Sequence, residues 1–169
     1  AMRASGGRGF EINVAACQDE AAFVRKLSKA ATTAARSRLG KAFSDLQDAA
    51  TALAGRVQNV KIPGVTEVSL SAAPPEDWTA VAGAALQLLA KANEQWLIYV
   101  DELPIMLHNM LRDDPGAGVG RVRLFMDWFR NDVRAMPECS QVRWLVTGSV
   151  GLDTLVQRHG MSDTINTMR

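Results

Sequence analysis

Two adjacent carboxylates, Asp101 and Glu102, are the residues best suited to chemistry in this chain. They follow an apolar run that begins at Gln95, and a second apolar run at residues 103–107 comes directly after them. A carboxylate at such a position can hold Mg²⁺ through water, and its neighbour can orient a water for attack on a phosphate. The pair therefore predicts a metal and water site that faces a nucleotide phosphate. Acidic residues are also common where a helix begins, so a helix start is the alternative interpretation.

Two hydroxyl residues, Thr147 and Ser149, follow another apolar segment, QVRWLV at residues 141–146. In an open α/β sheet, ligands bind beyond the carboxyl ends of the strands. We therefore expect both hydroxyl groups to lie near the carboxylates, where they could contact a phosphate. Ser149 could also cap the helix that comes next. Cys17 ends the first apolar segment near the same place, and a buried structural thiol is the alternative to a site residue.

The segments that must position these residues alternate between strand-like and helix-like patterns. This order predicts an α/β fold with parallel strands and crossover helices. Strands are expected at residues 9–17, 95–100 and 141–149; the second is nearly all apolar, which is typical of a parallel-sheet strand covered on both faces. Helices are expected at residues 18–39, 41–57, 78–92, 103–112, 121–136 and 150–160, a short hairpin or edge excursion at 60–70, and a flexible loop at 114–120.

The composition is that of an ordinary globular domain. The chain has 169 residues, of which 47% are hydrophobic and 22% charged, and its formal net charge is +1. This length suits a single domain, and the charge argues against a strongly basic nucleic-acid-binding protein. No stretch approaches the roughly 18 apolar residues of a membrane span, and the amino terminus lacks the apolar core of a signal peptide. Cys17 and Cys139 show no metal-binding spacing, so we expect free thiols and a cytoplasmic location.

Three segments together resemble the prokaryotic P-loop ATPases related to the AAA+ and STAND groups. They are WLIYVDELPIML at residues 96–107, LFMDWFRNDV at 124–133 and VRWLVTGSVGLDTLVQRHGMSDTIN at 142–166. Members of this group commonly carry an apolar strand that ends in Asp-Glu and, later, a strand end with the pattern TGS-GL. The resemblance covers residues 9–166. It implies a P-loop NTPase-type parallel sheet of order 5-1-4-3-2, with ATP and Mg²⁺ as ligands.

The resemblance also implies a role for each candidate residue. Asp101 corresponds to the Walker B aspartate, which binds Mg²⁺, usually through water, and Glu102 to the glutamate that orients the attacking water. Thr147 and Ser149 correspond to sensor 1, the polar position that reads the terminal phosphate. An intact protein of this kind would use ATP as a switch or a motor, often together with a C-terminal winged-helix region.

The phosphate-binding loop of this group, G-x-x-x-x-G-K-[ST], does not occur in the sequence. Gly40-Lys41 is not such a loop, because Ala35 and Ala42 stand where the first glycine and the hydroxyl residue belong. We therefore expect a partial ATPase domain without its first and last strands, which alone binds ATP poorly and is inactive. A non-catalytic interaction or scaffold module that has lost nucleotide binding is the alternative.

A missing first strand would leave the strand at residues 142–147 without a neighbour on one side. Unpaired backbone groups on an apolar edge favour pairing with another chain. We therefore expect self-association, in which two copies pair along this edge, exchange elements, or fill the gap with residues 60–70.

Arg123, Arg130 and Arg134 share a helical face, which predicts a solvated surface or, alternatively, an arginine finger.

Overall fold

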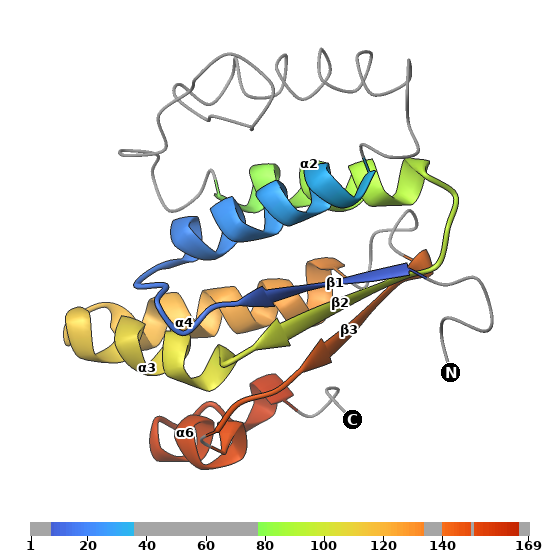
Figure 1. The fold of residues 1–169 in the computed structure, drawn as a ribbon. Coiled ribbons are helices and arrows are strands. Elements are labelled where there is room, and N and C mark those ends of the chain that lie inside the picture. The colour runs from blue at the N-terminus through green and yellow to red at the C-terminus, as the bar shows by residue number, and fades with distance from the viewer. Residues whose placement is uncertain (1–7, 36–77, 134–139, 150, 166–169) are drawn as a thin grey trace.

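The computed structural model describes residues 8–35, 78–133, 140–149 and 151–165 of the chain. Within them the chain forms a three-stranded parallel sheet of order β1-β2-β3 (Figure 1). The strands are β1 (Arg8–Asn13), β2 (Trp96–Asp101) and β3 (Val142–Val146). The central strand β2 has Asn13 opposite Asp101 on one side and Val146 opposite Val100 on the other. The predicted α/β fold with parallel strands is confirmed.

Helices connect the strands in the crossover manner that the sequence predicts. Residues 20–35 are helical, and they lie beside α2 in Figure 1. The remaining helices are α2 (Trp78–Lys91), α3 (Leu103–Asp113), α4 (Gly118–Asp127), a π-helical turn (Trp128–Asp132) that continues α4, α6 (Leu152–Arg158) and a 3-10 turn (Ser162–Ile165). The predicted helix at 41–57, the predicted hairpin at 60–70 and Cys139 lie outside the described residues.

Helix α4 begins three residues before the predicted start at Arg121, so only residues 114–117 connect it to α3. The turn is stabilised by Asp114, whose side chain accepts a hydrogen bond from the Ala117 N–H at 2.9 Å. Its carbonyl accepts a second one from the Gly118 N–H at 2.7 Å. A Cβ atom at Gly118 would lie 2.7 Å from the carbonyl oxygen of Met110. The glycine therefore allows the two helices to approach closely, and the predicted flexible loop at 114–120 was too long.

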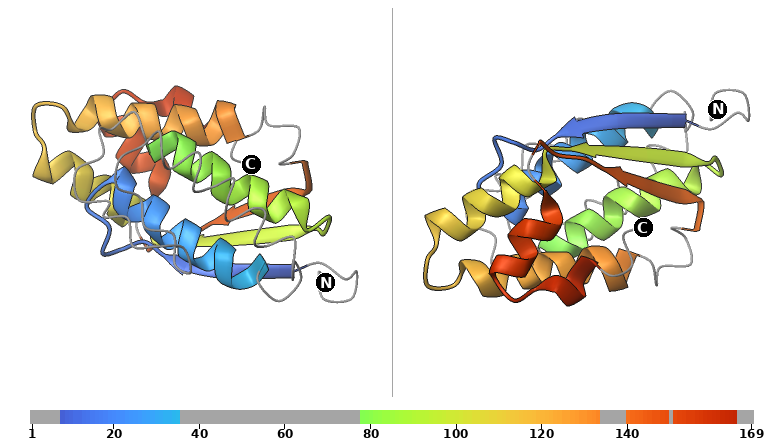
Figure 2. Two further views of the ribbon diagram at one scale, coloured as in Figure 1. Left: turned by 90° about the horizontal axis from the view of Figure 1, so that it is seen from above. Right: turned by 90° about the horizontal axis from the view of Figure 1, so that it is seen from below.

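The sheet buries one face more completely than the other. Trp96, Ile98 and Val100 of β2 are fully buried, and α2 and α4 lie on one side of the sheet in both views of Figure 2. The alternate residues Leu97 and Tyr99 are only half-buried. In the described part of the chain, helices cover one face of β2, and the other face, which the sequence also predicts to be covered, is half-buried.

An aromatic cluster forms the centre of the core on the covered face. Phe125 of α4 is completely buried, and its ring lies 5.0 Å from that of Phe23 and 5.8 Å from that of Trp78. The π-helical turn after α4 places Phe129 with its ring 4.7 Å from that of Trp144 on β3. The Phe23–Phe125 and Phe129–Trp144 contacts are edge-to-face, and such contacts add to the free energy gained by burying the rings. The cluster therefore joins α2, α4 and β3 to the helix of residues 20–35.

A buried ion pair joins the start of helix 20–35 to α4. The side chain of Glu20 is 3% exposed, and both of its oxygens accept hydrogen bonds from the guanidinium group of Arg121. Asp19 caps the same helix by accepting a hydrogen bond from the Ala22 N–H at 2.7 Å. The partner of Glu20 was not predicted.

Within the described ranges, no helix combines the length and the apolar character that crossing a membrane requires.

Candidate functional site

The carboxyl ends of all three strands meet at Asp101. Its Oδ2 accepts a hydrogen bond from the Asn13 amide of β1 at 3.0 Å. Its Oδ1 accepts one from the hydroxyl of Thr147, directly after β3, at 2.9 Å. The parallel register produces this arrangement, because Asn13 and Asp101 are partners in the β1–β2 ladder. The expected proximity of Asp101 and Thr147 is therefore present in the structure.

Tyr99 extends this network along the half-buried face of the sheet. The hydroxyl groups of Tyr99 and Thr147 lie 2.9 Å apart. Thr147 has one hydroxyl proton, and the charged carboxylate of Asp101 is the stronger acceptor for it. Tyr99 must then donate its own proton to Thr147. The result is a chain of hydrogen bonds that runs from Tyr99 through Thr147 to Asp101.

Glu102 adopts an unusual backbone conformation just beyond the strand. Its φ of 61° and ψ of 34° lie in the left-handed region, which a residue other than glycine adopts at a cost. This turn directs its carboxylate toward Ser149, whose backbone N–H and hydroxyl each donate to Glu102 Oε2 at 3.0 Å. The two remaining candidate residues are therefore also in contact. Glu102 is at the N-cap position of α3 but makes no side-chain cap, so the helix-start interpretation explains its position and not its contacts.

The loop after β1 is held in place by hydrogen bonds from Asn109 of α3. The Asn109 amide is buried and donates to the carbonyl of Ala15 at 3.0 Å and to that of Cys17 at 3.2 Å. The side chain of Cys17 is itself buried, and desolvation is the main cause that raises its pKa above the usual value. A protonated, enclosed thiol favours the structural interpretation of Cys17 over a role in the site.

Replacing Asn109 with alanine is expected to destabilise the protein by about 1–3 kcal/mol, because two carbonyl groups lose their donor. Urea denaturation would measure the change, and amide exchange in residues 14–19 should become faster. Asn131→Ala is the matched control, since Asn131 is exposed on the turn after α4. If both variants lose the same stability, Asn109 does not hold the loop.

Two members of the network, Asn13 and Tyr99, were not predicted from the sequence. Each carries a polar group on the strand face that contains Asp101. Their alignment with Asp101 in the sheet is the feature that could have identified them. Asn13 aligns with Asp101 once the first strand is paired in parallel with the second, and Tyr99 precedes Asp101 by two residues. The predicted site contained only residues at or beyond the end of a predicted strand, whereas Asn13 and Tyr99 lie inside the strands predicted at 9–17 and 95–100.

Arg123 of α4 and Arg130 of the π-helical turn after it both bind Asp163. Arg123 pairs with the Asp163 carboxylate at 2.7 Å, and Arg130 donates to the Asp163 carbonyl at 2.7 Å. They hold the 3-10 turn at residues 162–165 against α4, and the Arg123 side chain remains 46% exposed, in agreement with the predicted solvated surface. Arg134, the third member of that face, lies outside the described residues.

The donor set fits a cation that is bound through water better than one held directly. Among the described residues, no group of three or more His, Cys, Asp and Glu side chains could hold a metal ion. Asp101 accepts only neutral donors, Asn13 and Thr147, so its charge is not compensated by a cation within salt-bridge distance in the described chain. Each carboxylate oxygen has a second lone pair, which can accept a hydrogen bond from a water on Mg²⁺. Asp101 would hold the ion in this way, with Glu102 beside it.

Comparisons with known proteins give no family assignment. No protein-family profile, no curated protein and no solved structure matches this chain.

Proposed function

We propose that these strand ends are the magnesium and nucleotide side of a P-loop ATPase-type domain of the AAA+/STAND group. The observation that carries this proposal is the placement of Asp101 between Asn13 and Thr147, with Glu102 in contact with Ser149. Two carboxylates and two hydroxyl groups from separate strand ends form the polar set that water-mediated Mg²⁺ binding and phosphate contact require.

The strand order also supports the proposal. The observed order β1-β2-β3 corresponds to the three neighbouring strands 2, 3 and 4 in a sheet of order 5-1-4-3-2. In that arrangement β2 is the Walker B strand, and β3 is the strand that ends in sensor 1. Many parallel sheets share a sequential run of three strands, so this support is secondary to the side-chain contacts.

Each residue has a defined role in this proposal. Asp101 binds a water of the Mg²⁺ ion, and Thr147 holds the Asp101 carboxylate in position. Glu102 orients the attacking water after its carboxylate leaves Ser149, and Ser149 is then free to contact the terminal phosphate. ATP and Mg²⁺ would drive a switch or a motor in the intact protein. The sequence carries no phosphate-binding loop, so on its own this chain should bind ATP weakly and turn it over poorly.

A scaffold module without nucleotide binding is the second candidate, and one observation favours it. Both oxygens of Asp101 and one of Glu102 already accept hydrogen bonds from the protein. A network of this kind can stabilise the meeting point of three strands with no ligand. In this alternative Asp101 and Glu102 are structural residues and the half-buried face of the sheet is the functional surface.

Binding of Mn²⁺·ATP to the chain separates the two candidates. The ATPase-type proposal predicts a dissociation constant no tighter than roughly 0.1 mM, about −5.5 kcal/mol, because backbone donors for the phosphates are missing. Weak binding still brings the paramagnetic ion to the strand ends. The NMR amide signals of Asn13, Thr147 and Ser149 should therefore broaden first, and Asp101→Asn should abolish the broadening.

Asp113→Asn is the control, because it removes the same charge from an exposed position at the end of α3. It should leave the broadening unchanged. Uniform broadening, or none at millimolar Mn²⁺·ATP, would favour the scaffold candidate. A low-micromolar dissociation constant measured by calorimetry would contradict the expectation that the chain lacks a phosphate-binding element.

A further inference from the structure

Among the described residues, the backbone groups on the outer edge of β3 have no partner strand. Thr147 directs both of its backbone groups toward β2 and its turn: its N–H donates to the Val100 carbonyl at 2.9 Å, and its carbonyl accepts from the Leu103 N–H at 3.3 Å. Successive residues of a strand point their backbone groups to opposite sides. The N–H and C=O groups of Val142, Trp144 and Val146 therefore point away from β2, and no further strand of the described chain pairs with them.

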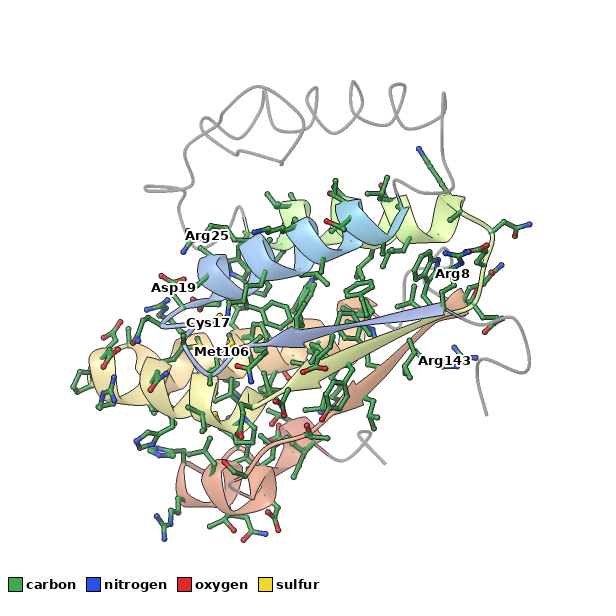
Figure 3. All side chains as sticks on the ribbon, in the orientation of Figure 1. Arg8, Cys17, Asp19, Arg25, Met106 and Arg143 are labelled. Carbon is green, nitrogen blue, oxygen red and sulfur yellow. The ribbon has the colours of Figure 1, made fainter. Side chains whose placement is uncertain are left out.

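The opposite edge of the sheet is protected, and this contrast makes the β3 edge distinctive. At β1 the ammonium group of Lys26 donates to the outward carbonyl of Asn13 at 2.6 Å. The exposed carboxylate of Glu11 lies on the same strand. Charged side chains, lysine above all, are a common means of preventing edge-to-edge pairing. Strand β3 carries one charge, Arg143, at the end of the sheet away from Cys17 (Figure 3).

We propose that β3 is a docking edge for β3 of a second copy of this chain, paired antiparallel about a two-fold axis at Trp144. Edge-to-edge pairing of identical strands across a two-fold axis is necessarily antiparallel, and it must be self-complementary. This register pairs Val142 with Val146 of the other copy and Trp144 with its own equivalent. This register pairs all three residues whose backbone N–H and C=O groups point away from β2. It joins the two sheets into a single sheet of about six strands, which is within the usual size of sheets.

Side chains on the half-buried face favour this register over its neighbours. Arg143 of one copy stands opposite Leu145 of the other. Leu145 is 48% exposed, and the aliphatic part of an arginine can cover such a side chain while its guanidinium group stays in water. Moving the axis to Arg143 would instead place two arginines directly opposite each other, which is unfavourable. Moving it to Leu145 would leave Val142 without a partner in the strand.

The first test is sedimentation of the full chain over a range of micromolar concentrations. We expect a reversible monomer–dimer equilibrium. Leu145→Lys should raise the dimer dissociation constant roughly tenfold or more, because the symmetric contact places the new lysine beside Arg143 twice. The double variant Arg143→Glu with Leu145→Lys should restore dimerisation, since the same positions then carry opposite charges. Val119→Lys, an exposed apolar residue on α4, is the control and should not change the equilibrium.

Amide hydrogen exchange tests the same edge in the unaltered protein, so its result does not depend on whether a variant folds. The N–H groups of Trp144 and Val146 should exchange more slowly as the concentration rises, while those of Gly9 and Glu11 on the β1 edge should not respond. A monomer at all concentrations would overturn the proposal. So would a dimer that Leu145→Lys leaves intact, or one that the double variant fails to restore. These outcomes do not depend on nucleotide binding, so they leave the proposed function to its own test.

Discussion

Replacing Arg121 with leucine is expected to lower the free energy of unfolding by about 3–5 kcal/mol, because the carboxylate of Glu20 would then be buried without a partner. Glu20 is almost completely enclosed, and Arg121 contributes both hydrogen bonds that reach it from α4. The hydrogen bond to Glu20 is also the main cause that raises the pKa of Arg121. Urea denaturation at neutral pH would measure the loss.

Arg112→Leu is the matched control for this experiment. Arg112 pairs with its neighbour Asp113 at 2.7 Å, but both side chains are well exposed. Exposed pairs contribute about 0–1 kcal/mol, so the control should change stability little. A deficit equal to that of the control would show that Glu20 finds another partner.

Phe125→Ala is expected to destabilise the protein by about 3–5 kcal/mol, the range for removing a large aromatic side chain from a packed core. Phe125 is completely buried, and its ring lies within 6.2 Å, centre to centre, of those of Phe23, Trp78, Trp128 and Phe129. Its removal would leave a cavity that several rigid rings cannot fill without shifting. Thermal and urea denaturation would both report the loss.

The residue beside it gives a stringent control. Leu124→Ala changes an adjacent position of α4 whose side chain is 50% exposed, so we expect a loss below about 1 kcal/mol. A large effect at Leu124 would mean that this surface is covered in solution. A small effect at Phe125 would mean that the aromatic cluster can repack around the missing ring.

The sequence predicted the parts of the fold that depend on local patterns. The apolar run before Asp101 predicted β2, and a helix was predicted at residues 121–136, most of which α4 and the π-helical turn after it form; both elements are confirmed. The site could be predicted in part for the same reason. Strand ends can be recognised from the sequence, and parallel strands bring their ends to one edge, so the proximity of Asp101 and Thr147 could be expected.

Features that depend on register or on distant partners could not be predicted. Asn13 joins the site only because β1 pairs with β2 at one particular offset. Glu20 and Arg121 are 101 residues apart in the sequence. The residues around each of them do not indicate which partner it has. The incomplete burial of Leu97 and Tyr99 was also unpredictable, since an apolar strand sequence does not reveal how far each of its faces is covered. Local sequence patterns therefore predict the helices and strands, whereas they do not predict which distant residues come into contact.

The π-helical turn at Trp128–Asp132 affects which insertions and deletions this helix could accommodate. An α-helix rotates by about 100° per residue, so a wider turn shifts the orientation of every residue after it. Phe129 and Val133 both reach the core with this turn in place. A single π turn accommodates one extra residue in an α-helix, so deleting one residue within it would restore regular α-helical spacing and leave Val133 facing the core. An insertion would rotate Val133 by about 100°, so this segment should tolerate the loss of one residue more readily than the gain of one.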